Sequence, residues 1–128
     1  MTPTPRLIHT GQALVDVLVD VPHLPRRGGN VMATSYTRHA GGAVNILVAA
    51  ARSGGQAVHA GAIGTGPNGD LISTTLAKEG IAMSAARVPD ADTGVCLVLL
   101  DPSAERTFIT TTGAERAVSV DSFGTCLL

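Results

Sequence analysis

The order of its predicted elements assigns this chain to the α/β class, with additional β structure. Two predicted helices, at about 43–53 and 67–79, alternate with short runs rich in Val, Leu and Ile. Such alternation is typical of strands joined by crossover helices. Two later β runs, "TGVCLVLLD" and "ERTFITTT", are joined by "PSA" and predict a hairpin outside this alternation. We therefore expect an α/β core that carries a small β appendage.

The chain before the first helix is predicted to be β structure interrupted by a loop. The run "RLIHTGQALVDVLVDV", which starts at Arg6, is rich in Val and Leu and is broken at Gly11. Residues 22–30, "PHLPRRGGN", predict a loop by their Pro and Gly content. The run "VMATSYT" at 31–37 contains β-branched and aromatic residues and predicts an exposed strand.

The two helices differ in pattern. In residues 43–53, Val44, Leu47, Val48 and Ala51 recur at helical spacing, while further apolar residues fill the other faces. Such a helix is expected to be buried nearly all round and to end at the glycine pair 54–55. After a short strand in "QAVHAGAI", the second helix begins with Pro in its first turn and is followed by Gly80.

Composition and charge indicate a packed globular protein and argue against several classes of partner. The chain has 128 residues, of which 45% are hydrophobic and 15% charged, as in a single packed domain. A net charge of −1 without a block of Lys or Arg argues against a nucleic-acid partner or an anionic membrane. The N-terminus lacks a signal-peptide layout and no apolar run approaches about 18 residues, so we expect a soluble cytoplasmic protein. Cys96 and Cys126 match no metal-ligand spacing and are expected to be free thiols.

The segment "GTGPNG" matches the dinucleotide pattern G-x-G-x-x-G at Gly64, Gly66 and Gly69, after a predicted strand and before a helix. Asp90 lies at about the distance expected for a ribose-binding carboxylate. Against this interpretation, Pro67 removes a backbone donor from the loop that would face a pyrophosphate. No G-x-x-x-x-G-K-[ST] sequence is present, which excludes a P-loop by its own criterion.

Other polar residues predict no catalytic or metal centre. The histidines show no helical pairing with carboxylates, and we expect structural or solvent-facing roles for them. Ser103 has no histidine at a nucleophile-motif spacing, which argues against a catalytic serine. The residues near the predicted hairpin turn are expected to be a solvated loop. These two groups are His9, His23, His39 and His59, and Asp101, Glu105 and Arg106.

Two features suggest a site for a hydroxylated ligand. Asp16 lies in the apolar run "ALVDVLV", where a carboxylate is costly unless it is paired or exposed at a cleft. It could accept hydrogen bonds from vicinal hydroxyls, or form a salt bridge at a strand end. Gly41 and Gly42 would let the backbone approach a ligand, and Asn45 in the following helical turn offers a donor and acceptors. A plain loop-to-helix turn remains the alternative.

Taken in order, "TGQALVD", "AGGAVNILVAAARSGG" and "GAIGTGPNG" resemble the N-terminal half of the ribokinase-like, or PfkB, family of carbohydrate kinases. The later "TGVCLVLLDPSAERTFITTTGAE" is similar to the lid hairpin of that family, so the resemblance runs from about Arg6 to Phe123. It implies a ribokinase-like three-layer core with a small β lid. It also implies transfer of phosphate from ATP, with Mg2+, to a hydroxyl of a small sugar or nucleoside.

The resemblance also implies roles for individual residues. Asp16 corresponds to a carboxylate that binds sugar hydroxyls, and Gly41, Gly42 and Asn45 correspond to further sugar contacts. The lid hairpin would cover the sugar and exclude water, with Thr110 and Thr112 among its side chains. We expect one incomplete domain over 1–128, and lid-mediated homodimers are consistent with the family. Its expected core spans about 6–13, 38–93 and 113–128, and its lid about 14–37 and 94–112.

The chain departs from the family pattern at informative places. Leu14 stands where ribokinase has a sugar-binding Asn, which argues against a ribose preference. Gly66 stands where the family often has Asp, and this replacement creates the apparent dinucleotide pattern. The family's C-terminal Gly-Ala-Gly-Asp signature, which supplies the catalytic base and the anion hole for ATP, is absent from the 128 residues.

We therefore expect the chain to be the sugar-binding half of a kinase, without catalytic residues, with most of the ATP site missing, and inactive alone. One alternative is a non-catalytic sugar-binding or dimerising module that uses the lid strands as an edge. The other is a dinucleotide-binding domain.

Overall fold

The computed structural model describes residues 2–124, so Cys126 and the end of the expected core lie outside the described residues. The elements follow one another in the α/β order expected, with a β hairpin near the C-terminal end. They are β1 Arg6–His9, β2 Ala13–Asp20, β3 Ser35–Gly42, α1 Ala43–Arg52, β4 Gln56–His59, α2 Pro67–Lys78, β5 Ala82–Met83, β6 Val95–Leu100, β7 Arg106–Thr110, a 3-10 turn Ala114–Arg116 and α3 Val120–Gly124.

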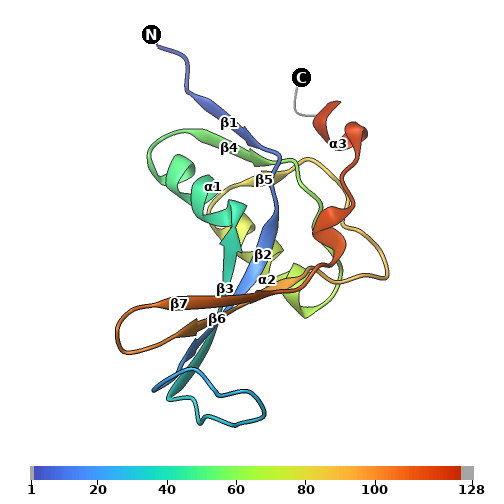
Figure 1. The fold of residues 1–128 in the computed structure, drawn as a ribbon. Helices are drawn as coiled ribbons and strands as arrows, with labels where there is room; N and C mark the ends of the chain where they lie inside the picture. Colours follow the sequence, from blue (N-terminus) through green and yellow to red (C-terminus); the bar gives the residue numbers. More distant parts are fainter. Residues whose placement is uncertain (1, 125–128) are drawn as a thin grey trace.

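The strands form two sheets that lie at different ends of the molecule. A parallel three-stranded sheet has the order β1-β4-β5, and a four-stranded sheet has the order β3-β2-β6-β7. In the second sheet β2 and β6 are parallel, while β3 and β7 run antiparallel to their neighbours. Figure 1 shows β1 and β4 at one end beside α1, and the long strands of the second sheet extending away from them.

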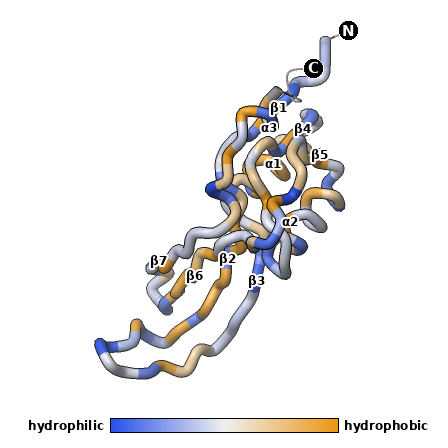
Figure 2. Tube along the Cα trace, turned by 90° about the vertical axis from the view of Figure 1, so that its right-hand side faces the viewer, coloured by the Kyte–Doolittle hydropathy of each residue, from blue (hydrophilic) through white to orange (hydrophobic). Residues whose placement is uncertain are grey.

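The two faces of the four-stranded sheet differ in burial, because successive side chains of β2 are alternately buried and half-buried. In β2, Ala13, Val15 and Val17 are buried, while Leu14 and Asp16 on the opposite face are half-buried. Figure 2 shows β2 and β6 as mainly hydrophobic, whereas β3 is more polar. This sheet therefore packs one face of β2 against the helices and leaves the face that carries Asp16 more open.

The core joins both sheets through the helices. Leu47 of α1, Ile72 and Leu76 of α2, and Val15 of β2 are fully buried in one apolar cluster. Burying a side chain of this size stabilises the fold by about 1.5–3 kcal/mol relative to leaving it exposed. On the other face of the parallel sheet, Val58 packs with Phe123 from α3. The base of the four-stranded sheet is thus part of the same core as α1 and α2.

The passage from β3 to α1 differs from the loop-to-helix turn expected from the sequence. The strand extends to Gly42 and the helix begins at the next residue, Ala43. Gly42 has φ 61°, a left-handed value that favours glycine, and a Cβ there would lie 2.5 Å from the carbonyl oxygen of Gln12. Residues 38–42, which we expected in the core, consequently pair with β2 in the four-stranded sheet. The strand predicted at 31–37 begins only at Ser35.

The expectation that α1 is buried all round is wrong. Ala43, Val44 and Leu47 face the core, but Ile46 is 52% exposed and Asn45 and Ala49 are also exposed. The sequence pattern alone could not separate the two faces because both carry small apolar side chains. The buried face of α1 packs mainly against β4, with further contacts to β1, β2, β3 and α2.

The predicted hairpin is confirmed, with β6 and β7 antiparallel from Cys96 opposite Thr110 to Leu100 opposite Arg106. Its turn is organised by Asp101, whose Oδ1 accepts hydrogen bonds from the N–H and the hydroxyl of Ser103. In the part of the chain that the structure describes, no helix is both long and apolar enough to cross a membrane.

Candidate functional site

A row of four side chains crosses the open face of the four-stranded sheet. Strand pairing places His39 opposite Asp16, Asp16 opposite Cys96, and Cys96 opposite Thr110. Directly paired residues on neighbouring strands project from the same face of a sheet. The row therefore brings together two of the predicted site residues, Asp16 and Thr110, and adds His39 and Cys96 between and beside them.

Asp16 lies directly against the backbone of Gly41. A Cβ built on Gly41 would collide with Asp16 Oδ2 and would lie 2.5 Å from its Cγ. The carboxylate of Asp16 therefore occupies the space that a side chain at position 41 would take. The structure thus brings together Asp16 and Gly41, which lie 25 positions apart in the sequence (41 − 16).

The carboxylate of Asp16 is half-buried and has no hydrogen-bond partner among residues 2–124. Burial raises its pKa, and the positive charge of His39 partly offsets this effect. The strand-end salt bridge considered as an alternative is not formed, because the two ion pairs of the described chain are Arg52–Glu79 and Arg87–Asp70. Asp16 therefore keeps its acceptor capacity for a ligand.

The start of α1 lies beside Asp16 through Gly41 and Gly42. Its N-cap residue, Gly42, offers no side-chain cap, and its first turn contains no acidic residue. Asn45 is exposed on this first turn. The N–H of Ala43 is already bonded to the carbonyl of Gln12 at 2.9 Å, and the remaining N–H groups of the first turn give a partial positive charge that suits hydroxyl or anionic oxygens. Of these residues Gly41 contacts the carboxylate of Asp16, and Gly42 and Asn45 follow it within four positions of the chain.

The two predicted lid threonines are placed differently. Thr110 is in β7, and its hydroxyl lies 3.5 Å from Cys96 Sγ, in the row that contains Asp16. Thr112 follows the end of β7 in an exposed segment and is not part of that row. Cys96 is a free thiol, as expected. The sequence did not single out His39 or Cys96 because strand register, which creates the row, cannot be derived from either residue alone.

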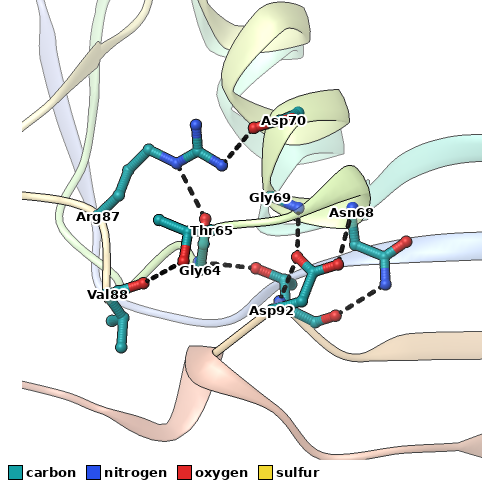
Figure 3. A network of polar contacts seen from close by, with 9 residues as sticks. Gly64, Thr65, Asn68, Gly69, Asp70, Arg87, Val88 and Asp92 are labelled. Atoms are coloured by element: carbon teal, nitrogen blue, oxygen red, sulfur yellow. Dashed lines mark hydrogen bonds and ion pairs between the residues drawn. The ribbon is translucent and has the colours of Figure 1, made fainter. Parts of the chain in front are cut away.

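The glycine-rich loop at 64–69 is closed by the chain itself (Figure 3). The backbone N–H groups of Asn68 and Gly69 donate to Asp92 at 3.0 and 2.8 Å, and that of Gly64 donates to Thr93 Oγ1 at 2.9 Å. A dinucleotide would need these same N–H groups for its pyrophosphate. The structure therefore argues against the dinucleotide interpretation, and Asp90 is simply an exposed residue at φ 59°.

Asp92, which closes this loop from a later segment of the chain, was not identified from the sequence. Burial tends to raise the pKa of its carboxyl, but three backbone N–H donors and the charge of Arg87 bring the pKa below its usual value. Arg87 also ties the loop to α2, since it donates to the carbonyl of Gly64 and forms an ion pair with Asp70 at 2.6 Å. No local sequence signal connects Asp92 with a helix that starts 25 residues earlier at Pro67 (92 − 67).

The histidines show no arrangement for catalysis or metal binding. His9 accepts a hydrogen bond from Gly11 N–H at 2.9 Å, and the ring of His23 lies 3.0 Å from the carbonyl oxygen of Leu24. His59 is fully buried without a side-chain partner, and burial together with the charge of His9 lowers its pKa to about 4. Within the described residues, no group of three potential ligands could hold a metal ion.

The comparison with known proteins agrees with this arrangement. A model of the family described as pfkB family carbohydrate kinase matches residues 5–123. The chain belongs to the pfkB family of carbohydrate kinases. A curated relative, the uncharacterized sugar kinase YegV of Escherichia coli K12, is 38% identical over 106 residues, covering 82% of this chain and 33% of the relative.

Solved structures of ribokinases and fructokinases share this fold. The ribokinase of Cryptococcus neoformans, in complex with ADP, has a TM-score of 0.77 at 29% identity and covers 89% of this chain and 35% of its own. The fructokinase of Xylella fastidiosa has a TM-score of 0.72 at 28% identity, with 93% and 38% covered. A ribokinase of Giardia lamblia, at 23% identity and a TM-score of 0.81, shows the shared fold alone. The ribokinase-like fold is confirmed, and the chain spans about a third of the length of these relatives.

Proposed function

We propose that this chain is the sugar-binding part of a pfkB carbohydrate kinase, in which a sugar hydroxyl accepts phosphate from ATP. The observation that carries the proposal is the unpartnered carboxylate of Asp16 packed against the backbone of Gly41. A carboxylate without a protein partner can accept two hydrogen bonds from neighbouring hydroxyls of a polyol. The absence of a side chain at Gly41 leaves room for that carboxylate.

Residues on the two sides of Asp16 would complete the sugar site. Asn45 and the uncapped start of α1 would bind further hydroxyls from the helical side. Thr110, with Cys96, would line the site from the hairpin side. We infer that the four-stranded sheet is the lid and that it excludes water from the bound sugar, which protects a phosphoryl donor against hydrolysis. Thr112, outside the row, would contribute only if the lid rearranges on binding.

ATP and Mg2+ are the cofactors of such a reaction, but the residues described do not fit them. Within residues 2–124 no three ligands for a metal ion gather, and the amides of the glycine-rich loop are already bound to Asp92 and Thr93. The catalytic-base signature of the family is absent from the 128 residues. For this chain we therefore propose sugar binding and assign no residue to phosphoryl transfer.

Isothermal calorimetry of the purified chain against aldoses, ketoses and nucleosides tests the proposal. Asp16→Asn and Asn45→Ala should each weaken binding by about tenfold or more, because each removes hydrogen bonds to a hydroxyl. Asp101→Asn is the matched control, since Asp101 lies in the hairpin turn and bonds only its own loop. Binding that is unchanged in Asp16→Asn, or lost equally in Asp101→Asn, would contradict the assignment.

A second role is favoured by the edge of the four-stranded sheet. We propose that β7, which has a partner on only one side, also mediates a homodimer, because its Phe108 and Ile109 are 58% and 55% exposed. Analytical ultracentrifugation should show a concentration-dependent dimer that Phe108→Ser with Ile109→Lys converts to a monomer. A chain that is monomeric at all concentrations would exclude this role and leave the sugar site unaffected.

A further inference from the structure

A buried carboxylate joins the two places where the chain crosses between the helical core and the hairpin. Glu115 is only 3% exposed. Its Oε2 accepts a hydrogen bond from Gly94 N–H, just before β6, and its Oε1 accepts one from Gly113 N–H, after β7, both at 2.8 Å. A buried carboxylate is costly unless both oxygens are bonded, and here both are. The side chain of Glu115 therefore fixes the distance between the two segments that connect the core with the hairpin.

Glu115 is connected to Asp16 through the backbone of Gly94 and Val15. The N–H of Gly94 donates to Glu115, and the carbonyl of Gly94 accepts a hydrogen bond from Val15 N–H at 3.2 Å. Val15 directly precedes Asp16 in β2. Gly94 itself has no space for a side chain, because a Cβ there would lie 2.7 Å from Glu115 Oε1. Displacement of Glu115 would thus be passed to the strand that carries the proposed sugar-binding carboxylate.

A second carboxylate holds the same crossing from the side of α2 (Figure 3). Asp92 accepts hydrogen bonds from Asn68 and Gly69 in the first turn of α2. The side-chain amide of Asn68 in turn donates to the carbonyl of Thr93 at 3.0 Å and accepts a hydrogen bond from Arg38 of β3 at 2.5 Å. The start of β6 and the strand β3 are therefore both anchored to the beginning of α2.

We propose that Glu115 and Asp92 are positioning residues that set the orientation of the four-stranded sheet relative to α1, and so hold Asp16 at the working distance from Asn45. The inference rests on the proposed sugar site, whose groups lie on two elements: Asp16 on β2 and Asn45 on α1. A site divided in this way depends on the geometry of the junction, because misplacing either group loses its hydrogen bond. Neither carboxylate contacts the sugar in this assignment.

Residual dipolar couplings of the 15N-labelled chain test the positioning role directly. In the wild type, amides of β2, β3, β6 and β7 should share one alignment tensor with those of α1, α2 and β4. In Glu115→Gln, which keeps the size of the side chain but loses its charge, the two sets should require different tensors. Asp92→Asn provides a second variant at the other carboxylate, in case Glu115→Gln does not fold, and Asp101→Asn is the control. A role in stability alone would lower the urea midpoint and leave one common tensor, which would overturn the inference.

Sugar affinity supplies an independent reading. If a sugar is bound, Glu115→Gln and Asp92→Asn should each weaken its affinity by about tenfold, whereas Asp101→Asn should not. If Glu115→Gln requires two alignment tensors but the wild type binds no sugar, the proposed function is contradicted and the positioning role is supported. If both variants keep the sugar affinity of the wild type and one common tensor, the positioning role is contradicted and the sugar site is unaffected.

Discussion

The two helices α1 and α2 both begin directly after a glycine, but the chain closes only one of the two helix starts with a carboxylate. Each follows a glycine with positive φ, Gly42 at 61° and Gly66 at 138°. The start of α2 is closed by Asp92, which accepts hydrogen bonds from Asn68 and Gly69. The start of α1 has no side-chain cap, and the nearby carboxylate of Asp16 rests on Gly41 without a hydrogen-bond partner in residues 2–124.

This difference separates a structural glycine turn from the one proposed to bind a ligand. A helix start with its own carboxylate has satisfied its donors and gains nothing from an external oxygen. A helix start without one, beside an unpartnered carboxylate, has both donors and acceptors available for a polyol. Glycine content alone therefore does not identify a ligand site. The loop at 64–69 matches a nucleotide-binding pattern, but its backbone N–H groups are already bonded to Asp92.

The largest expected effect contrasts alanine at the two starts. A Cβ at Gly69 would collide with the carbonyl of Gly64, which is backbone, whereas a Cβ at Gly41 would collide with the Asp16 side chain, which can move. Gly69→Ala should therefore cost about 3 kcal/mol of unfolding free energy and Gly41→Ala about 1 kcal/mol. Urea denaturation measures both.

Double variants that also remove the neighbouring carboxylate provide the control for these two glycine substitutions. Combining Gly41→Ala with Asp16→Ala should recover most of the stability lost in Gly41→Ala, because the clash partner is gone. No such recovery should follow when Gly69→Ala is combined with Asp92→Ala. Equal costs at the two glycines, or recovery at both, would show that the two starts are packed alike.

His59 gives the free energy of unfolding a pH dependence of about the size expected for Gly69→Ala. The pKa of His59 is lowered from 6.5 to about 4, so the unfolded chain binds the proton more readily between these values. Stability is then complete above pH 6.5 and falls by about 3 kcal/mol as the pH drops towards 4. In His59→Gln this part of the pH–stability profile should be flat, and a profile that keeps its slope would contradict the assignment.

The smallest expected effects have opposite signs at the two carboxylates. The pKa of Asp92 is lowered, so its contribution to stability is present above pH 3.8 and is lost as pH falls through the folded value. The pKa of Asp16 is raised by burial, so its contribution is favourable at low pH and is lost as pH rises. In the His59→Gln background at pH 7, Asp92→Asn should lower stability and Asp16→Asn should slightly raise it. A loss of stability in both variants would mean that Asp16 has a partner.

Local patterns were sufficient for most elements of the fold. Gly and Pro marked the ends of α1 and α2, and the β hairpin followed from two β runs around a short polar turn. The predictions were wrong where contacts with residues far away in the sequence determine the structure. The exposure of Ile46 depends on which face of α1 meets β4, and the extension of β3 to Gly42 depends on pairing with β2.

The candidate site was predictable only in part for the same reason. Asp16 attracted attention because a carboxylate interrupts an apolar run, and the glycine pair was visible in the sequence. The neighbours of Asp16, His39 and Cys96, follow from strand register, which no local pattern contains. Asp92 and Glu115 bind backbone N–H groups that lie 21 to 24 positions away, and such contacts leave no mark on local composition.

A sugar titration of the 15N-labelled chain, followed by amide chemical shifts, tests the central claim most directly. The account predicts saturable shifts at Asp16, Gly41 and Asn45, at the open start of α1, while Asn68 and Gly69 at the closed start of α2 stay unchanged. Shifts confined to 64–69, or no saturable shift at Asp16 and Asn45 with any sugar tested, would contradict it.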